Sequence, residues 1–329
     1  MPTGPVVLLG PQRAAPSLPA ACAEVGLSDH DSLALVSAGW EEREAEDETL
    51  REALTQPLHN LELHARAERV FREDAPLFDA LRARHDRMRR LRTVYRRRLD
   101  HSMAAWRDVL RLQDRGGAPG EGAEDEFTAL ERLDLGELPL MKEVLEDATQ
   151  AVRDLDAGHL ARVAALQLEF EQELRLPERP ALAAQRQQVA ALLGDCAGLL
   201  IAGGHVAVLL NRLRLFGLAE MMLALPVLGW SAGAMVLTER IVLFHDSPPQ
   251  GQGAAEVFEP GLARAPGVVA LPDAATRLLL DDPLRVATLA RRMQPATCVL
   301  LDEGERITCD DHACRPARRL SSDGKVLAA

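Results

Sequence analysis

At 329 residues the chain can form one large domain or two ordinary ones, and its 47% hydrophobic residues can fill a substantial core. The formal net charge of −12 argues against a general nucleic-acid binder, because neutralising phosphates requires a basic face. No apolar run approaches the roughly 20 residues that span a bilayer, and no basic segment with a long apolar stretch opens the sequence. We therefore expect a soluble cytoplasmic protein without membrane contact.

The first 64 residues predict alternating strands and helices. Short apolar runs predict strands at Val6–Leu9 and Leu33–Ser37, and the alternating Leu58–His64 predicts a third. Helices are expected at Ser17–Val25 and at Glu41–Leu54, whose early acids suit a helix N-terminus. This alternation is typical of an α/β fold.

Residues 65–177 change to a long helical pattern and form a predicted insertion. Ala65–Gln113 and Met141–Leu176 flank a Gly/Pro-rich stretch, so an antiparallel helical hairpin is the simplest arrangement. A short extra helix is expected at Glu126–Leu133. Interruptions of the helical pattern are expected at Pro76, Gly136–Pro139 and Gly158.

A dense run of arginines occupies residues 82–98 of this insertion. One interpretation is an anionic partner such as nucleic acid. The favoured one is a solvated helix face that pairs with acids of the returning helix, and sparse aromatic residues further disfavour nucleic acid. The acids suggested as partners are Glu143, Glu146 and Asp147.

After Pro177 the α/β pattern resumes, and residues 1–64 plus 178–329 are predicted to form one domain. The fold class expected is a mostly parallel, three-layer α/β/α sheet with a large all-helical insertion. Helices are expected in this second part at Ala181–Leu193 and Val206–Phe216. Strands are expected at Gly198–Ala202, Val227–Leu228, Gly267–Leu271, Thr297–Asp302 and Glu305–Thr308, and the last of these are candidates for antiparallel pairing.

Gly229-Trp230-Ser231-Ala232-Gly233 fits the G-x-S-x-G spacing of a nucleophile elbow. It follows an apolar strand and precedes a helix, and glycines on both sides allow the close packing that projects the serine hydroxyl. The N–H of Ala232 would then point toward an oxyanion. The alternative is a small residue in a tight turn without catalysis.

A second glycine turn, Gly203-Gly204 followed by His205, comes after the preceding strand. Glycine pairs let a backbone approach a ligand or donate N–H groups, although ordinary strand-to-helix turns use them too. Both turns fall at the carboxyl ends of parallel strands, where open α/β sheets place their active sites.

Together, IAGGHVAVLLNRLRLFGL and GWSAGAMVL resemble the core of the serine peptidases related to dipeptidase E and cyanophycinase, which have the class I glutamine-amidotransferase-like fold. The resemblance covers roughly residues 184–300, is weaker over 1–64 and is absent from the insertion. It implies that Ser231 is the nucleophile, that Gly204 and Ala232 provide the oxyanion hole, and that Asp246 belongs to the triad. A small peptide or amide is the implied substrate.

The family's histidine position is held by Asp273 in this sequence. A serine hydroxyl needs a base within hydrogen-bond reach, so another group has to serve. His205 is the better substitute because its turn should lie beside the serine. His245, next to Asp246, more often points elsewhere, and Asp273 itself would act only if desolvation raised its pKa.

The sequence leaves two functions open. The first is a serine hydrolase of peptide or amide bonds, with the insertion as a lid. The second is a catalytically degenerate protein whose insertion binds a protein partner or forms a homodimer.

No cofactor is expected, and Cys309-x-x-His312-x-Cys314 offers too few soft ligands for a metal site. The five scattered cysteines predict reduced thiols.

Overall fold

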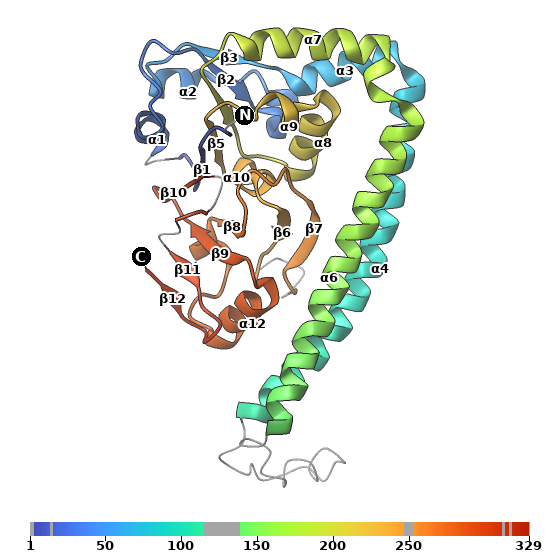
Figure 1. Ribbon diagram of the computed structural model, residues 1–329, viewed down its shortest axis with the longest axis vertical. Helices are drawn as coiled ribbons and strands as arrows, with labels where there is room; N and C mark the ends of the chain where they lie inside the picture. Colours follow the sequence, from blue (N-terminus) through green and yellow to red (C-terminus); the bar gives the residue numbers. More distant parts are fainter. Residues whose placement is uncertain are drawn as a thin grey trace.

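The computed structural model describes residues 3–13, 16–114, 139–246, 253–310, 313–315 and 318–328. At its centre is a six-stranded sheet in the order β10-β1-β5-β4-β2-β3 (Figure 1). Every neighbouring pair is parallel except β1 and β10, so the predicted mostly parallel sheet is confirmed. The strands are β1 (Val6–Leu9), β2 (Leu33–Val36), β3 (Leu58–Asn60), β4 (Gly198–Ile201), β5 (Val227–Trp230) and β10 (Arg306–Cys309).

Successive side chains of a strand point to opposite faces of the sheet, and the apolar strands here are buried on both. Helices accordingly cover both faces. Val7 of β1 packs with α1 (Leu18–Glu24) on one face, whereas Val6 belongs to the larger core with α8 (Val206–Phe216) and α10 (Ala232–Leu237). The three-layer architecture is therefore confirmed. The other helices near this sheet are η1 (Ala38–Arg43), α2 (Glu48–Ala53), α3 (Leu63–Glu73), η2 (Leu176–Glu178), α7 (Pro180–Gly194) and α9 (Leu218–Met221).

The late strands do not complete the central sheet as expected. Only β10 joins it, as an antiparallel edge strand. β8 (Val268–Pro272) and β9 (Thr297–Leu301) pair in parallel within a separate four-stranded sheet. An apolar run shows that a segment is a strand but not which strand it pairs with, so the sequence could not separate the sheets. The remaining elements are β6 (Arg240–Leu243), β7 (Glu256–Pro260), α11 (Ala274–Arg277), α12 (Pro283–Met293), β11 (Arg319–Leu320) and β12 (Val326–Leu327).

Two long antiparallel helices, α4 (Ala75–Asp114) and α6 (Pro139–Leu174), form the hairpin and run side by side along the flank of the α/β part (Figure 1). The predicted interruption near Pro76 is confirmed, because α3 ends at Glu73, Asp74 is non-helical, and Pro76 lies in the first turn of α4, where its missing N–H costs nothing. The break considered at Gly158 is absent, since this residue lies inside unbroken α6. Neither these nor any other helix in the described residues is long and apolar enough to cross a bilayer. The predicted helix Glu126–Leu133 lies outside the described residues, and the domain limits at 64/65 and 177/178 stay predictions.

A buried polar network around Tyr95 fixes the hairpin to the rest of the protein. The Tyr95 hydroxyl donates to the Asp156 carboxylate on α6 (2.7 Å) and accepts from the N–H of Val257 on β7 (3.2 Å). Arg292 of α12 donates to both carboxylate oxygens of Asp156 (2.7 and 2.8 Å). The His159 ring stacks on Tyr95 with 4.0 Å between ring centroids. The hairpin is thus packed against β7 and α12, and dimerisation through it stays a prediction.

The arginine run pairs with other acids than the sequence suggested. Arg87 pairs with Glu169 of α6 (2.8 Å), and Arg92 donates to both oxygens of Glu256 on β7. Because Arg87 faces Glu169 in the antiparallel hairpin, residues 143–147 lie opposite the later part of α4, beyond the arginines. Pairing with an acid of the returning helix is therefore present at Arg87, whereas within the described residues no ion pair joins residues 143–147 to arginines 82–98, so the particular acids expected are wrong.

The expectation that all thiols are reduced is also wrong. Cys309, the last residue of β10, forms a disulfide with Cys314. The two sulfurs are consequently unavailable as metal ligands, and His312 between them lies outside the described residues. The free cysteines, all buried, are Cys22, Cys196 and Cys298.

Candidate active site around Ser231

Ser231 occupies the junction between β5 and α10 in a strained backbone conformation. Its φ of 51° and ψ of −117° are unfavourable for a residue with a side chain, at a cost of about 1–3 kcal/mol. The Ser231 N–H donates to the carbonyl oxygen of Leu9 on β1 (3.2 Å), and its own carbonyl oxygen accepts from Met235 in α10 (3.1 Å). The neighbouring strand and the following helix therefore hold the serine in this conformation.

The two glycines flanking Ser231 allow β5, β4 and α10 to meet closely. A Cβ at Gly229 would lie 2.7 Å from Cδ1 of Leu237 and 2.8 Å from the Gly233 backbone. A Cβ at Gly233 would overlap the carbonyl oxygen of Ile201 at the end of β4. The close packing expected from the G-x-S-x-G spacing is therefore present, and no larger residue fits at either glycine without moving the backbone.

The Gly203-Gly204 turn lies directly beside the serine. A Cβ at Gly203 would stand 2.9 Å from Cβ of Ser231 and 3.5 Å from its Oγ. Gly204 has a φ of +105°, which favours glycine, and a Cβ there would overlap the carbonyl oxygen of Gly39. The side chain of Ser231 is half-buried and faces the glycine backbone of the neighbouring turn.

A third loop, which sequence reasoning missed, backs this turn. It follows β2, and its Gly39 carbonyl oxygen accepts the N–H of His205 (2.7 Å). A Cβ at Gly39 would lie 2.5 Å from the carbonyl oxygen of Gly203. Glu41 in this loop has nearly the same strained backbone as Ser231, with φ 58° and ψ −123°. The available signal was Ser-Ala-Gly after a buried strand, the same strand-then-glycine pattern that marks the other turns.

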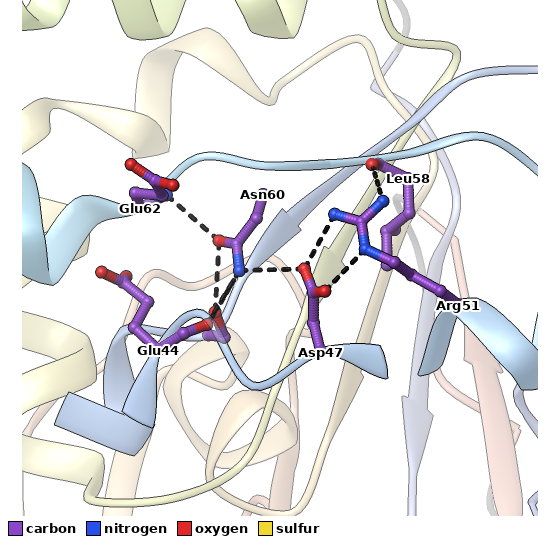
Figure 2. Close-up of polar contacts among 7 residues, drawn as sticks. Glu44, Asp47, Arg51, Leu58, Asn60 and Glu62 are labelled. Carbon is purple, nitrogen blue, oxygen red and sulfur yellow. Dashed lines mark hydrogen bonds and ion pairs between the residues drawn. The ribbon is translucent and has the colours of Figure 1, made fainter. Parts of the chain in front are cut away.

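A polar network holds the loop after β2 in place (Figure 2). The Asn60 amide donates to the carbonyl oxygen of Glu44 (2.9 Å) and to the carboxylate of Asp47 (3.2 Å). Arg51 donates to both Asp47 oxygens (2.6 and 2.9 Å) and to the carbonyl oxygen of Leu58 (2.7 Å). The loop that carries Gly39 is thereby tied to β3.

The Glu44 carboxylate links the same loop to the start of α3. It accepts the backbone N–H groups of His64 and Ala65, both at 2.9 Å, which lie in the first turn of that helix. Burial raises the pKa of Glu44, although these two hydrogen bonds favour its charged form. The carboxylate therefore acts as a structural cap on α3.

His205 caps α8. Its Nδ1 accepts the N–H of Val208 (3.3 Å), so in the neutral ring the proton resides on Nε2. To accept a proton from Ser231, the imidazole would have to exchange tautomers or release the helix cap. His205 is brought to the turn that contacts Ser231, as the sequence predicted, but its basic nitrogen is engaged.

Asp273 follows β8 and is held by two arginines. Its carboxylate lies 3.3 Å from Arg13 and 3.8 Å from Arg277, and its side chain is 17% exposed. The Asp273 N–H donates to the carbonyl oxygen of Leu301 at the end of β9 (3.0 Å). The Asp273 carboxylate is therefore already engaged by two cations.

Asp246 has a different set of neighbours. Its buried carboxylate accepts from the Leu279 N–H (2.9 Å) and pairs with Arg285, and its own N–H donates to the carbonyl oxygen of Arg277 (2.7 Å). The hydrogen bonds that join Ser231 to Leu9 and Met235 are made by its backbone and do not bear on this role. The triad role of Asp246 stays a prediction. The adjacent His245 is exposed, as expected for side chains that diverge along an extended chain.

Comparison with known proteins adds little to this geometry. No family model matches the chain, and no curated protein matches it. Among solved structures, a protein named as a candidate peptidase E from Listeria monocytogenes EGD-e is 16% identical, with a TM-score of 0.30 over 41% of this chain. The chain spans 65% of that protein's length. A peptidase from an acI-B1 Actinobacterium is 13% identical, with a TM-score of 0.26 over 68% of this chain and 82% of its own.

Proposed function

We propose that this protein is a serine hydrolase of peptide or amide bonds with Ser231 as its nucleophile. The observation that supports this most is the placement of Ser231. Its backbone is strained at a strand-to-helix junction, and its side chain lies so close to the Gly203 turn that a Cβ at Gly203 would stand 2.9 Å from Cβ of Ser231. Strain of this kind costs stability and persists where surrounding structure enforces it, which is common at catalytic residues.

The reaction would follow the acyl-enzyme route. Oγ of Ser231 adds to the substrate carbonyl carbon as its proton passes to a base, and the oxyanion accepts hydrogen bonds from the N–H groups of Gly204 and Ala232. Ala232 is the first residue of α10, so its N–H has no acceptor within the helix. Collapse of the intermediate expels the amine, which takes the proton, and water then hydrolyses the ester.

The identity of the general base, which accepts the proton of Ser231, most needs a test. His205 is the first candidate because it belongs to the turn that contacts Ser231. We assign it the role of general base, with Nε2 accepting the proton of Ser231. This requires the tautomer that carries its proton on Nδ1, so Nδ1 can no longer accept the N–H of Val208 and the helix cap is released. Asp273 is the second candidate and would have to leave Arg13.

Labelling with a fluorophosphonate probe tests the proposal on the full chain. We expect covalent labelling that mass spectrometry locates on Ser231 and that Ser231→Ala abolishes. His205→Gln should slow labelling, whereas Asp246→Asn should leave its rate nearly unchanged if that carboxylate only holds Arg285. Absence of labelling beside an active serine peptidase in the same reaction would refute the hydrolase proposal.

A second function is favoured by one group of contacts. Three of the predicted catalytic side chains are engaged by other groups: His205 by Val208, Asp273 by Arg13 and Asp246 by Arg285. Such engagement fits a catalytically degenerate protein in which the helical hairpin binds a partner. Failure of the labelling experiment would leave this binding function as the proposal.

A further inference from the structure

A groove of ≈ 570 Å³ runs between α4 and α6 on the side of the hairpin that faces away from the α/β part of the protein. Every residue of its lining belongs to one of these two helices, so the groove opens toward solvent. Its lining includes Arg87, Arg90, Arg98 and Arg162. Among the described residues, only Arg87 of these four has an ion pair, with Glu169. This end of the hairpin therefore presents three positive charges without acidic partners.

Closer to the tip of the hairpin, the same side of α6 is acidic. Residues three or four apart share one face of a helix, so the stripe that contains Arg162 continues through positions 158, 154, 151 and 147. Asp147 and Asp154 in this stripe are both exposed. Asp154 accepts a hydrogen bond from the neutral Gln150 (2.7 Å), and neither aspartate has an ion pair within the described part of the chain. The acids are thus as free to pair as the arginines.

The opposite side of α6 is already used. Val152, Asp156 and His159 are buried, and the last two belong to the network that holds the hairpin to β7 and α12. The charged stripe points away from these contacts. We call this surface the outer face of the hairpin and define it by Arg90, Val94 and Arg98 of α4 with Asp147, Asp154 and Arg162 of α6.

Apolar and small residues accompany the charges. Val94 on the basic half is 60% exposed, and Val144 beside the acidic half is 36% exposed, so each half offers apolar surface to an interface. Ala151 and Gly158 lie between the two halves of the stripe, where their small size lets another helix approach closely.

We propose that the outer face docks against the outer face of a second copy of this chain, with the two hairpins antiparallel. A two-fold axis perpendicular to the helices lays the basic half of each copy on the acidic half of the other, whereas an axis along the hairpin would place arginines against arginines. With the perpendicular axis near residue 156 of α6, Arg162 comes level with residue 150 of the second copy, between its Asp147 and Asp154.

The overlap is large enough for a specific dimer. From Arg87 to Asp114 α4 extends about 40 Å, and two helices side by side are about 20 Å wide. The resulting area of about 800 Å² per copy is the usual size of a specific interface. The net charge of −12 opposes contact between most surfaces of two copies, so attraction requires a local match of opposite charges such as this one.

This proposal does not depend on the hydrolase function. The outer face points away from the α/β part, which carries Ser231 (Figure 1). Fluorophosphonate labelling of Ser231 should accordingly be the same in chains that dimerise and in chains that do not.

Sedimentation velocity of the full chain over a series of concentrations tests the dimer. We expect the mass to approach twice the 35.9 kDa of one chain as concentration rises. Arg98→Glu with Arg162→Glu should weaken association about tenfold or more, because like charges then meet at both ends of the two-fold interface. Asp147→Arg with Asp154→Arg should weaken it similarly.

An equimolar mixture of the two charge-reversed variants should dimerise again. Each half of one variant then meets an oppositely charged half of the other, and this rescue excludes misfolding as the cause of the loss. The matched control Arg43→Glu with Arg175→Glu makes the same change in net charge at exposed positions outside the hairpin and should dimerise as the native chain does.

Three results would overturn the proposal. The native chain could stay monomeric at every concentration, the dimer could survive both charge reversals, or the mixture of the two variants could stay monomeric. A monomeric chain that binds a single-stranded oligonucleotide through Arg98 and Arg162 would assign the outer face to nucleic acid instead. Dimerisation without labelling of Ser231 would refute only the hydrolase function, and labelling of a monomeric chain only the dimer.

Discussion

Removing the Asp156 carboxylate should destabilise the protein strongly. Asp156 and its partner Arg292 are each 2% exposed, and the guanidinium donates to both carboxylate oxygens. Asp156→Ala would leave a buried arginine charge without its counter-ion, for which the loss is about 3–5 kcal/mol. Tyr95→Phe is the milder comparison, because it removes one hydroxyl from the same network and should cost about 1–3 kcal/mol.

Urea unfolding of the full chain, followed by circular dichroism, measures both losses. The double replacement Asp156→Leu with Arg292→Met should recover part of the stability lost in Asp156→Ala, since it removes both charges instead of one. A loss below about 1 kcal/mol for Asp156→Ala would match a solvated ion pair and refute the reasoning.

Three further expectations follow from individual contacts. Gly203→Ala should abolish fluorophosphonate labelling of Ser231 and cost about 1–3 kcal/mol of stability, because its methyl group would crowd the serine; unchanged labelling would contradict the contact. Burial lowers the pKa of His159, so its contribution to stability is present above about pH 6.5 and is lost as the pH falls through the lower folded-state pKa. Urea unfolding between pH 7 and pH 5 should therefore show a smaller decline for His159→Gln, and an identical decline would exclude this residue as a cause. In the denatured chain iodoacetamide should modify three cysteines without reductant and five after reduction, whereas five without reductant would disprove the bond between Cys309 and Cys314.

Local spacing predicted what depends on local geometry. The strands β1, β2, β4 and β5 and the hairpin helices follow from apolar runs and helical periodicity. The tight packing around Ser231 follows from the two flanking glycines. These features need only residues that are close in sequence.

Features that depend on distant residues were not predictable in the same way. The Gly39 loop lies against the Gly203 turn because β2 and β4 are neighbours in the sheet, which no short motif records. Likewise, Glu256 rather than Glu143 binds the arginine run, since the partner was fixed by how the hairpin packs on β7. The roles inferred for Asp246 and Asp273 depend on distances that the sequence does not contain.

The two attachments of the hairpin bear on how far it can move. α4 is joined to the α/β part through α3 at one end, and it is held to β7 and α12 farther along by the network around Tyr95. A helix pair held at two separate points has fewer ways to swing than one held at a single end. We therefore expect the spacing between the hairpin and α8 to stay nearly constant rather than to open and close as a lid would.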